Sequence, residues 1–581
     1  MKLLPVRKLI NSSCFSLANW TQILAIGVTS LLLRIYVPAV PYYTAAHDDF
    51  LMVSMANNIL NGQWLGDYSE LTHRALSKGP GYSMFIAWTH FLPWSPVVTV
   101  HILLLAGALF CLFQLAALGM NRKLVIPSFL FISFFPVWFG DSMSRIYRDG
   151  FLTACVFTAT GSIVLLNKLI SISHSRGRIN FQQIISLAFA GAVFGLTVSI
   201  SFITKNTVYP LVLLGVTVSV QILIKHFSKV TTKTISIFFL SAFVAFQPLT
   251  MFIKHENQTH YGVSVIENYY SGSFARTLKL MSAVSPVSDK RYVAVTKYAR
   301  QNMYAASPTL RKLQPWLEGK PGEGWRAASC ASPMKICDES GAWFPWELRD
   351  ASELAGLANS ATAFEVTFQD IYNELITACR TNQLNCSKSA IVPGFPMLSN
   401  VPIRDVLEST SETVSSIWNL NSAQKGSNSF YEGLDQKVIS AWKNTIHDLP
   451  LNEPLPIYKS MQGFGVSTIN LLRSVYSILW QFLILICLVA FLAILSKGFR
   501  RTSKPEEILV SLIGSATCAV FIVSILEAGL GGYLTIGGNL YTLGIYPLVL
   551  LMIPIALSEL LSRFQEWIKV NRAVPGTCND I

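Results

Sequence analysis

The sequence predicts an all-α polytopic membrane protein. Of its 581 residues, 51% are hydrophobic and only 13% carry a charged side chain, a balance that soluble globular domains rarely show. The mean hydropathy is +0.44, and long apolar stretches recur along the chain. The net charge of +13 would suit nucleic-acid binding in a soluble protein, but basic loops beside a membrane explain it better. No nucleic-acid partner is therefore expected.

About ten apolar stretches are predicted to form transmembrane helices. A helix needs roughly 20 apolar residues to cross the hydrocarbon core of a bilayer. A further apolar stretch, 81–92, is too short to span and is expected to lie half inserted or in the interface. The ten expected spans are 17–39, 96–119, 124–140, 150–169, 183–204, 207–224, 234–252, 471–495, 507–526 and 542–560.

Lysine and arginine residues cluster in alternate loops and predict the orientation. With ten spans, every cluster falls on one side, which the positive-inside tendency makes cytoplasmic. We expect an uncleaved first span, both termini in the cytoplasm and a location in a bacterial inner (plasma) membrane. The clusters are Lys2, Arg7 and Lys8; Arg122 and Lys123; Lys168, Arg176 and Arg178; Lys225, Lys229 and Lys233; Lys497, Arg500, Arg501 and Lys504; and Arg563, Lys569 and Arg572.

The stretch between the seventh and eighth spans is long enough to form a domain. We expect 254–470 to be a mainly helical outer (periplasmic) domain inserted between a membrane module, 1–253, and a C-terminal module, 471–581. Apolar residues recur at helical spacing from Leu354 to Leu375, which predicts one amphipathic helix. Four tryptophans either pack in the core, stack on sugar rings or lie at the membrane interface, and they are Trp316, Trp325, Trp343 and Trp346.

Cysteine usage agrees with this orientation. Four of the ten cysteines lie in 254–470, in two pairs whose members are seven residues apart. In an oxidising compartment this spacing favours two disulfides, although sequence alone leaves the connectivity open. A zinc site is the alternative, but the close CxxC spacing typical of such sites is missing. The cysteines are Cys330, Cys337, Cys379 and Cys386.

The first charged outer stretch contains His47, Asp48 and Asp49, just past the first span. Apolar residues of 52–60 recur at helical spacing and predict a helix in the membrane interface. Paired acids are costly at that depth, which indicates a function, whereas a solvated loop is the alternative. Partial desolvation is expected to raise the pKa of Asp48.

Two further outer stretches carry charge. Arg145 and Asp149 are four residues apart, so on a helix they would share a face and pair. They either anchor the fourth span or place a second acid and a phosphate-binding arginine in the cleft of Asp48. Lys205 lies alone between two spans on the outer side, where a positive charge departs from the positive-inside pattern and indicates a bound anion.

Short motifs in the outer loops and the last span form one pattern. Its segments are Asp48-Asp49, Ala56, Gly62, Trp64, Lys78-Gly79-Pro80, Arg145 to Asp149, Thr204-Lys205 and Tyr541 to Pro547. This pattern resembles the signature of the GT-C glycosyltransferases, membrane enzymes that use polyprenyl-phosphate sugars. The most similar branch contains the bacterial aminoarabinose transferase and the protein O-mannosyltransferases. The chain departs from that branch at Met52, Asp49, Gly79 and Leu540, and 254–470 has no counterpart in it.

The resemblance implies an inverting glycosyltransferase that moves a sugar from a polyprenyl-phosphate donor to a lipid, glycan or protein acceptor on the outer face. It implies Asp48 and Asp49 as catalytic residues, with Asp48 as the base that takes the acceptor proton. Asp149 belongs to the second acidic motif. The cations expected to hold the donor phosphate are Lys78, Arg145 and Lys205.

A polytopic transporter or lipid-linked-sugar flippase is the alternative function, and a non-catalytic scaffold is a third. A transporter typically shows two similar halves and ionisable groups at mid-span, whereas seven spans precede 254–470 here and three follow. The glycosyl transfer requires no cofactor, but a divalent metal remains open. Its candidate ligands, besides the Asp48 pair, are His47, His255, Glu256 and His260.

Overall fold

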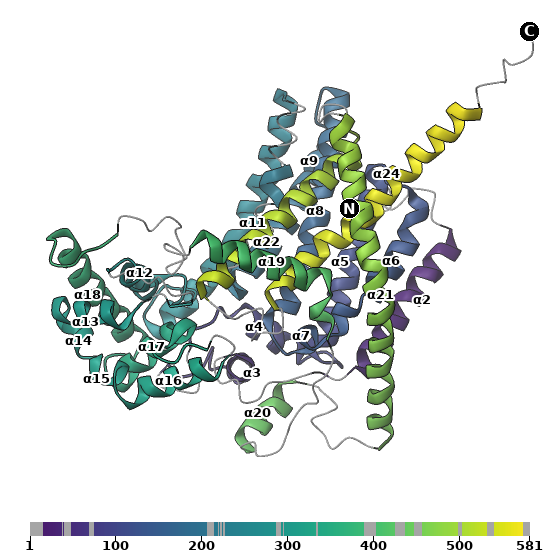
Figure 1. Cartoon of the computed structure of the whole chain (residues 1–581). Coiled ribbons are helices and arrows are strands. Elements are labelled where there is room, and N and C mark those ends of the chain that lie inside the picture. Colours follow the sequence, from purple (N-terminus) through teal and green to yellow (C-terminus); the bar gives the residue numbers. More distant parts are fainter. Residues whose placement is uncertain are drawn as a thin grey trace, which may run out of the picture.

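The protein is helical throughout the part that the structure describes (Figure 1). Within that part the sole β-type contact is an isolated antiparallel bridge between Val284 and Cys386. The predicted all-α class is therefore confirmed. The structure, a computed structural model, describes residues 16–37, 39, 48–68, 75–205, 214–218, 220, 224, 227–285, 292–293, 295–332, 335–387, 402–424, 436–446, 456–497, 502–530 and 540–572.

Eight helices among the described residues are long and apolar enough to cross a membrane, and each overlaps one of the expected spans. The helix α2 (Leu17–Tyr36) forms where the first span was expected but is not one of the eight, because Asn19, Gln22 and Arg34 lower its hydropathy. The expected span 207–224 lies mostly outside the described residues. The eight are Pro96–Leu118, Arg122–Phe139, Arg148–Arg176, Phe181–Thr204, Lys229–Tyr261, Gly463–Ser496, Lys504–Ala528 and Leu540–Ile568.

The membrane helices form one bundle in which α8 is central: it packs against α5, α9 and α24, and α11 lies along α9 (Figure 1). Their bounds are α5 (Pro96–Leu118), η1 (Arg122–Leu124), α6 (Val125–Ser133), η2 (Pro136–Phe139), α8 (Arg148–Arg176), α9 (Phe181–Thr204), α11 (Lys229–Tyr261), α21 (Pro456–Lys497), α22 (Lys504–Leu530), η7 (Leu540–Ile545) and α24 (Tyr546–Arg572).

A cluster of short helices stands to one side of the bundle (Figure 1). Phe274, Phe364 and Phe368 pack their rings together in its core. The two disulfides are confirmed, and each joins the cysteines seven residues apart, Cys330 to Cys337 and Cys379 to Cys386. We call this cluster the outer helical domain. Its helices are α12 (Gly272–Met281), α13 (Lys297–Ala306), α14 (Pro308–Arg311), α15 (Gln314–Leu317), α16 (Lys320–Ala331), η3 (Gly341–Trp343), α17 (Phe344–Leu354) and α18 (Ala361–Arg380).

The expected amphipathic helix is confirmed from Ala361 to Leu375, which lie in α18 with their apolar side chains buried, but it does not extend back to Leu354, where a separate helix ends. The helix α17 ends at Leu354, and Gly356 follows in a left-handed conformation with φ of 72°. The Leu357 amide then donates to the Ser352 carbonyl at 3.0 Å, a bond typical of a glycine-terminated helix. The next helix begins at Ala361 after a Ser360 cap.

Part of 254–470 lies with the membrane helices. The expected boundaries at 254 and 470 fall inside α11 and α21. The helix α19 (Ile403–Trp418) packs along α22, and the Trp480 indole of α21 donates to the Ile417 carbonyl at 2.9 Å. The next turn, η4 (Asn421–Ala423), contacts η7. This arrangement brings the end of α19 close to the last span.

The loop between α2 and α5 is folded into the protein. It contains α3 (Asp49–Leu60) and α4 (Gly81–Thr89), which pack on each other, and α3 also contacts α20 (Gln436–Thr445). Residues 51–56 are all buried. The apolar side chains of α3 are therefore covered by neighbouring helices of the protein, and the expected place of this helix in the membrane interface stays a prediction.

Candidate active site

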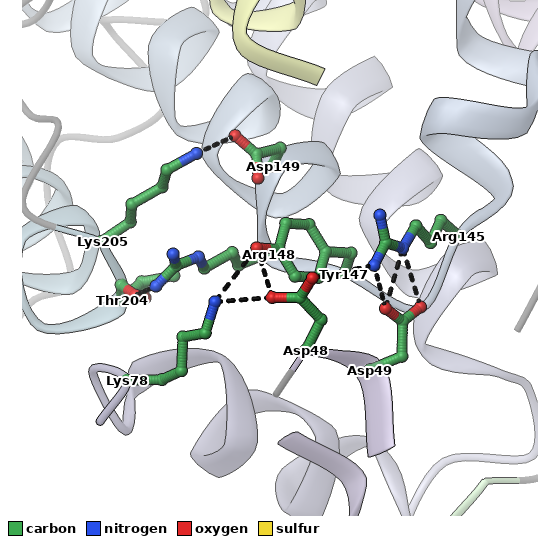
Figure 2. Close-up of polar contacts among 9 residues, drawn as sticks. All are labelled: Asp48, Asp49, Lys78, Arg145, Tyr147, Arg148, Asp149, Thr204 and Lys205. Carbon is green, nitrogen blue, oxygen red and sulfur yellow. Dashed lines mark hydrogen bonds and ion pairs between the residues drawn. The ribbon is translucent and has the colours of Figure 1, made fainter. Parts of the chain in front are cut away.

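Four segments that are distant in sequence, one of them ending in Lys205 directly after α9, bring their charged side chains together (Figure 2), at the end of the bundle where α3, α4 and α7 (Asp141–Ser144) lie (Figure 1). Asp48 and Asp49 stand at the start of α3, and Lys78 precedes α4. The third segment runs from α7 into α8. We call the whole group the acid–cation cluster, and it consists of Asp48, Asp49, Lys78, Arg145, Tyr147, Arg148, Asp149 and Lys205.

Asp48 is the accessible acid of the cluster. Its Oδ1 accepts from the Lys78 ammonium at 2.6 Å and from the Tyr147 hydroxyl at 3.1 Å. Its Oδ2 lies 3.4 Å from the Arg145 guanidinium. The Asp48 side chain keeps 35% of its surface exposed, against 0% for Asp49. A reactant can therefore approach Asp48 directly, whereas Asp49 is covered.

Asp49 holds Arg145 in place. The Arg145 Nε donates to both Asp49 oxygens, at 3.0 and 2.8 Å, and its Nη2 donates to Oδ2. This fork-like pairing is the strong geometry for an arginine and a carboxylate. Asp49 therefore lies beneath Arg145 and fixes the position of its guanidinium, and the catalytic role expected for Asp49 stays a prediction.

The expected pair between Arg145 and Asp149 is wrong. Arg145 follows α7 in an extended conformation with ψ of 140°, so the helical spacing of four does not apply to it. Asp149 lies in the first turn of α8 and instead accepts from the Lys205 ammonium at 2.6 Å. Lys205 is buried, and its ammonium lies 3.8 Å from the centre of the Tyr541 ring. Lys205, the lysine expected to lie alone between two spans, is thus paired with Asp149.

Gly79 explains one departure from the family pattern. A Cβ atom built on Gly79 would lie 2.2 Å from the Ile203 carbonyl at the end of α9, so a side chain has no space there. The loop that carries Lys78 therefore passes directly over the end of α9. Arg148 donates to the Thr204 carbonyl from the other side at 3.2 Å. These contacts hold Lys78, Arg148 and Lys205 at one place.

The expected rise in the pKa of Asp48 is wrong. Burial alone raises that pKa, but the charges of Lys78 and Arg145 outweigh it and hold the pKa well below its usual range. Burial lowers the pKa of Lys78, against the opposing effect of Asp48. Burial also lowers the pKa of Lys205 to about 8, although Asp149 acts in the opposite direction. Asp48 is therefore an ionised, weak base while Lys78 contacts it.

The outer helical domain adds residues that the sequence analysis did not assign to the site. The Trp346 ring of α17 lies 5.4 Å from the Lys78 ammonium. Arg349, one turn further along α17, is buried and donates to the Tyr68 hydroxyl at 3.3 Å and to the Ala75 carbonyl at 3.4 Å. The domain thus docks on the loop that carries Lys78. No motif indicates this contact, because its residues are about 270 positions apart in the chain.

Tyr147 and Arg148 lie inside the Arg145 to Asp149 motif, but no role was expected for either of them. The Tyr147 hydroxyl bonds Asp48 and lies 3.4 Å from the Lys78 ammonium. Burial and the Asp48 charge raise the pKa of Tyr147 well above its usual value, so the phenol keeps its proton. Tyr147 is therefore a neutral donor beside the exposed acid.

The candidate metal ligands do not assemble around the aspartates. His255, Glu256 and His260 lie on α11, where the His260 ring nitrogen is 3.5 Å from the Glu256 carboxylate. The His260 ring stacks on Trp64. Among the described residues no three His, Cys, Asp or Glu side chains form a group that could hold a metal ion. His47 lies outside the described residues.

The acid–cation cluster contains more cations than acids. Lys78, Arg145, Arg148 and Lys205 supply four cations, and three aspartates oppose them. Only Asp48 among these acids has substantial exposure. Comparisons of the chain with protein-family models, with curated proteins and with solved structures find no match.

Proposed function

We propose that the chain is a membrane glycosyltransferase that moves a sugar from a polyprenyl-phosphate donor to an acceptor on the outer side of the membrane. The observation that carries this proposal is the convergence of the resemblance motifs on Asp48. The carboxylate of Asp48, its cation Lys78 and the second-loop Arg145 meet within hydrogen-bonding distance or close to it, although about a hundred residues separate the first from the last.

The donor phosphate takes the place of Asp48 on Lys78. A polyprenyl-phosphate sugar is a phosphodiester with one negative charge. Lys78 contacts Asp48 (Figure 2), and the charge of Arg148 acts on both residues. Once Lys78 binds the phosphate, Asp48 loses the strongest opposing charge on its pKa. Its pKa rises, and the carboxylate becomes a better base. Donor binding thereby activates the acid that must accept a proton.

The transfer itself is a single displacement. The acceptor oxygen forms a bond to the anomeric carbon while the bond from that carbon to the phosphate oxygen breaks. The acceptor proton moves to the Asp48 carboxylate, and the bonding electron pair leaves with the phosphate to give a polyprenyl phosphate. The phosphate gains a second negative charge, which the surrounding cations stabilise in the transition state. The sugar configuration inverts.

The position of the charges supports an enzyme more than a transporter. Arg148 and Asp149 begin α8, and Lys205 directly follows α9, so the cluster lies at helix ends and not at mid-span. The disulfides Cys330–Cys337 and Cys379–Cys386 favour an oxidising compartment for the outer helical domain. The proposal therefore includes a bacterial inner membrane, cytoplasmic termini, about ten spans and an outer site.

The test is binding of undecaprenyl phosphate, the lipid product of the proposed transfer, by the purified full chain in lipid nanodiscs. Undecaprenyl phosphate should bind, and Lys78→Ala should weaken its binding by about tenfold to a hundredfold, as expected on losing a charge-assisted contact worth about 1.5–3 kcal/mol. Lys320→Ala, an exposed lysine of the outer helical domain, is the matched control and should bind normally. Equal affinities in all three proteins would refute the phosphate site.

A further inference from the structure

A cavity lies near the acid–cation cluster, beside the end of α9 that precedes Lys205. It has a volume of about 420 Å³ and lies where α9 and α11 meet the segment 263–271, which we call the strap. Phe202 and Phe246 form its apolar wall, and their ring centres are 5.6 Å apart. The strap supplies polar side chains, Ser264, Glu267, Tyr270 and Ser271, which we call the polar wall, beside the apolar Val265 and Ile266. The helix α11 adds Gln247, Thr250 and Lys254 to the lining.

The strap is fixed by hydrogen bonds at both ends. Asn257 of α11 is fully buried; its amide donates to the Val265 carbonyl at 2.6 Å and its oxygen accepts from the Trp64 indole at 2.9 Å. Further along, the Asn268 amide donates to the Leu76 carbonyl at 2.7 Å, two residues before Lys78. The polar wall is therefore held in place before any ligand arrives.

The two walls select an amphipathic ligand. Phe202 and Phe246 belong to helices that are long and apolar enough to cross a membrane, and Met251 and Phe252 expose large apolar side chains on α11 nearby. The polar wall offers a buried carboxylate at Glu267, which is 3% exposed. The Glu267 carboxylate can accept hydrogen bonds from a hydroxyl-bearing group. The neighbouring serine and tyrosine hydroxyls can donate hydrogen bonds to the same group. An alkyl chain fits against the apolar wall of Phe202 and Phe246, and a sugar-like head group fits against the polar wall of the strap.

The cavity and the cluster share an electrostatic environment. Burial lowers the pKa of Lys78, and Glu267 of the strap opposes that shift together with Asp48. Burial raises the pKa of Tyr270 to about 12, and Glu267 adds to the rise, so the Tyr270 phenol remains a donor. A head group in the cavity is thus beside the cations that hold the donor phosphate.

We infer that the cavity is the acceptor site and that it binds the hydroxyl-bearing head of a membrane-borne glycolipid. This inference rests on the proposed function. It assigns the strap, at the start of a segment with no counterpart in the resembling family, the task of presenting an acceptor hydroxyl to the reaction. Glu267 is then a binding residue for the acceptor, distinct from Asp48, which takes the proton.

The test uses a diazirine-bearing dodecyl β-glucoside as probe and the full chain in nanodiscs of phosphatidylethanolamine and phosphatidylglycerol. After irradiation, label should concentrate on the peptides that contain 246–254 and 264–271. Glu267→Gln, which removes the carboxylate charge, should lower that label by about tenfold, and Ser264→Trp, which fills the cavity, should abolish it. Glu256→Gln alters a partly exposed carboxylate outside the cavity and should label as the unchanged protein does.

The outcomes separate this inference from the proposed function. Label spread evenly over the lipid-facing helices, or unaffected by Ser264→Trp, would overturn the acceptor site. So would label that excess phosphatidylglycerol removes and excess dodecyl maltoside does not, because the cavity would then hold a phospholipid. In both cases undecaprenyl phosphate binding would still depend on Lys78. Loss of that dependence with strap labelling intact would instead refute the phosphate site and leave the cavity as a glycolipid site.

Discussion

The outer helical domain and the acid–cation cluster both pair arginine with carboxylates, but the two sets of ion pairs differ in their partners and in their exposure. In the domain, Arg300 is 1% exposed and donates to Glu318 at 2.8 Å, to Glu339 at 3.0 Å and to the Val295 carbonyl at 3.1 Å. Each partner lies within 39 residues of Arg300. In the cluster, partners of Asp48 come from segments 30 to 99 residues away.

The two networks also differ in the solvent exposure of their carboxylates. The Glu318 side chain is 17% exposed and that of Glu339 is 8% exposed, so the domain network is closed and serves the fold. Asp48 is 35% exposed and shares its two oxygens among three donors. An incoming anion cannot reach the buried ion pairs of the domain. It can reach Asp48, where it can replace the carboxylate as the partner of a cation. This contrast separates a structural ion network from a binding site.

The largest expected effect tests the closed network. Arg300→Met leaves Glu318 and Glu339 without their buried cation, which should cost about 3–5 kcal/mol of unfolding free energy. The measurement is the melting temperature of the purified protein, with limited proteolysis of the outer helices. Arg276→Met, at an exposed arginine of the same domain, is the control. Equal melting temperatures for the two variants would contradict a structural role for Arg300.

The next effect tests the open carboxylate. Asp48→Asn should keep the fold, because an amide oxygen still accepts from Lys78 and Tyr147. Turnover should nevertheless fall about a hundredfold or more, as expected on losing a general base. The measurement is release of polyprenyl phosphate, with the melting temperature as the check on folding. Asp49→Asn should instead lower the melting temperature, because it removes the buried carboxylate that pairs with the Arg145 guanidinium.

Near-normal turnover by a folded Asp48→Asn protein would refute its role as the base. If a folded Asp49→Asn protein were then inactive, the base would move to Asp49, and the positioning role given to Asp49 would be wrong. The pair of variants therefore tests whether exposure or sequence position identifies the base.

A smaller effect tests how the outer helical domain contributes to the cluster. Trp346→Leu removes the ring beside the Lys78 ammonium, a contact worth about 0.5–2 kcal/mol. Undecaprenyl phosphate affinity should change by roughly twofold to thirtyfold, with little change in melting temperature. Trp325→Leu is the matched control: that indole donates to Asp350 at 3.1 Å within the domain, so its loss should lower the melting temperature and leave the affinity unchanged. A lower melting temperature with unchanged affinity for Trp346→Leu would show that Trp346 only stabilises the fold.

The helical class and eight of the spans follow from the sequence because hydropathy is local, and a helix satisfies its own backbone in lipid. The paired cysteines were predictable for a similar reason, since seven residues suffice to close the loop. The pairing of Arg145 was not predictable from spacing, because the chain leaves the helix there and Asp49 reaches it from another loop. The pKa of Asp48 was missed for the same reason: burial is indicated by its position, but the two cations come from elsewhere. Trp346 and Glu267 depend on tertiary docking alone.

The smallest effect tests the innermost cation of the cluster by pH. Burial lowers the pKa of Lys205 to about 8, so its ammonium is charged below that pH and loses its proton above it. A bound phosphate favours the charged form, and linkage then requires affinity to fall as pH rises above 8, by at most about tenfold per pH unit. Undecaprenyl phosphate affinity measured from pH 6.5 to 9.5 should be flat at first and then decline. Lys205→Arg keeps its charge across this range, so its affinity should stay flat throughout. An unchanged decline in Lys205→Arg would show that another group titrates, and a flat profile in the unchanged protein would show that Lys205 only pairs with Asp149.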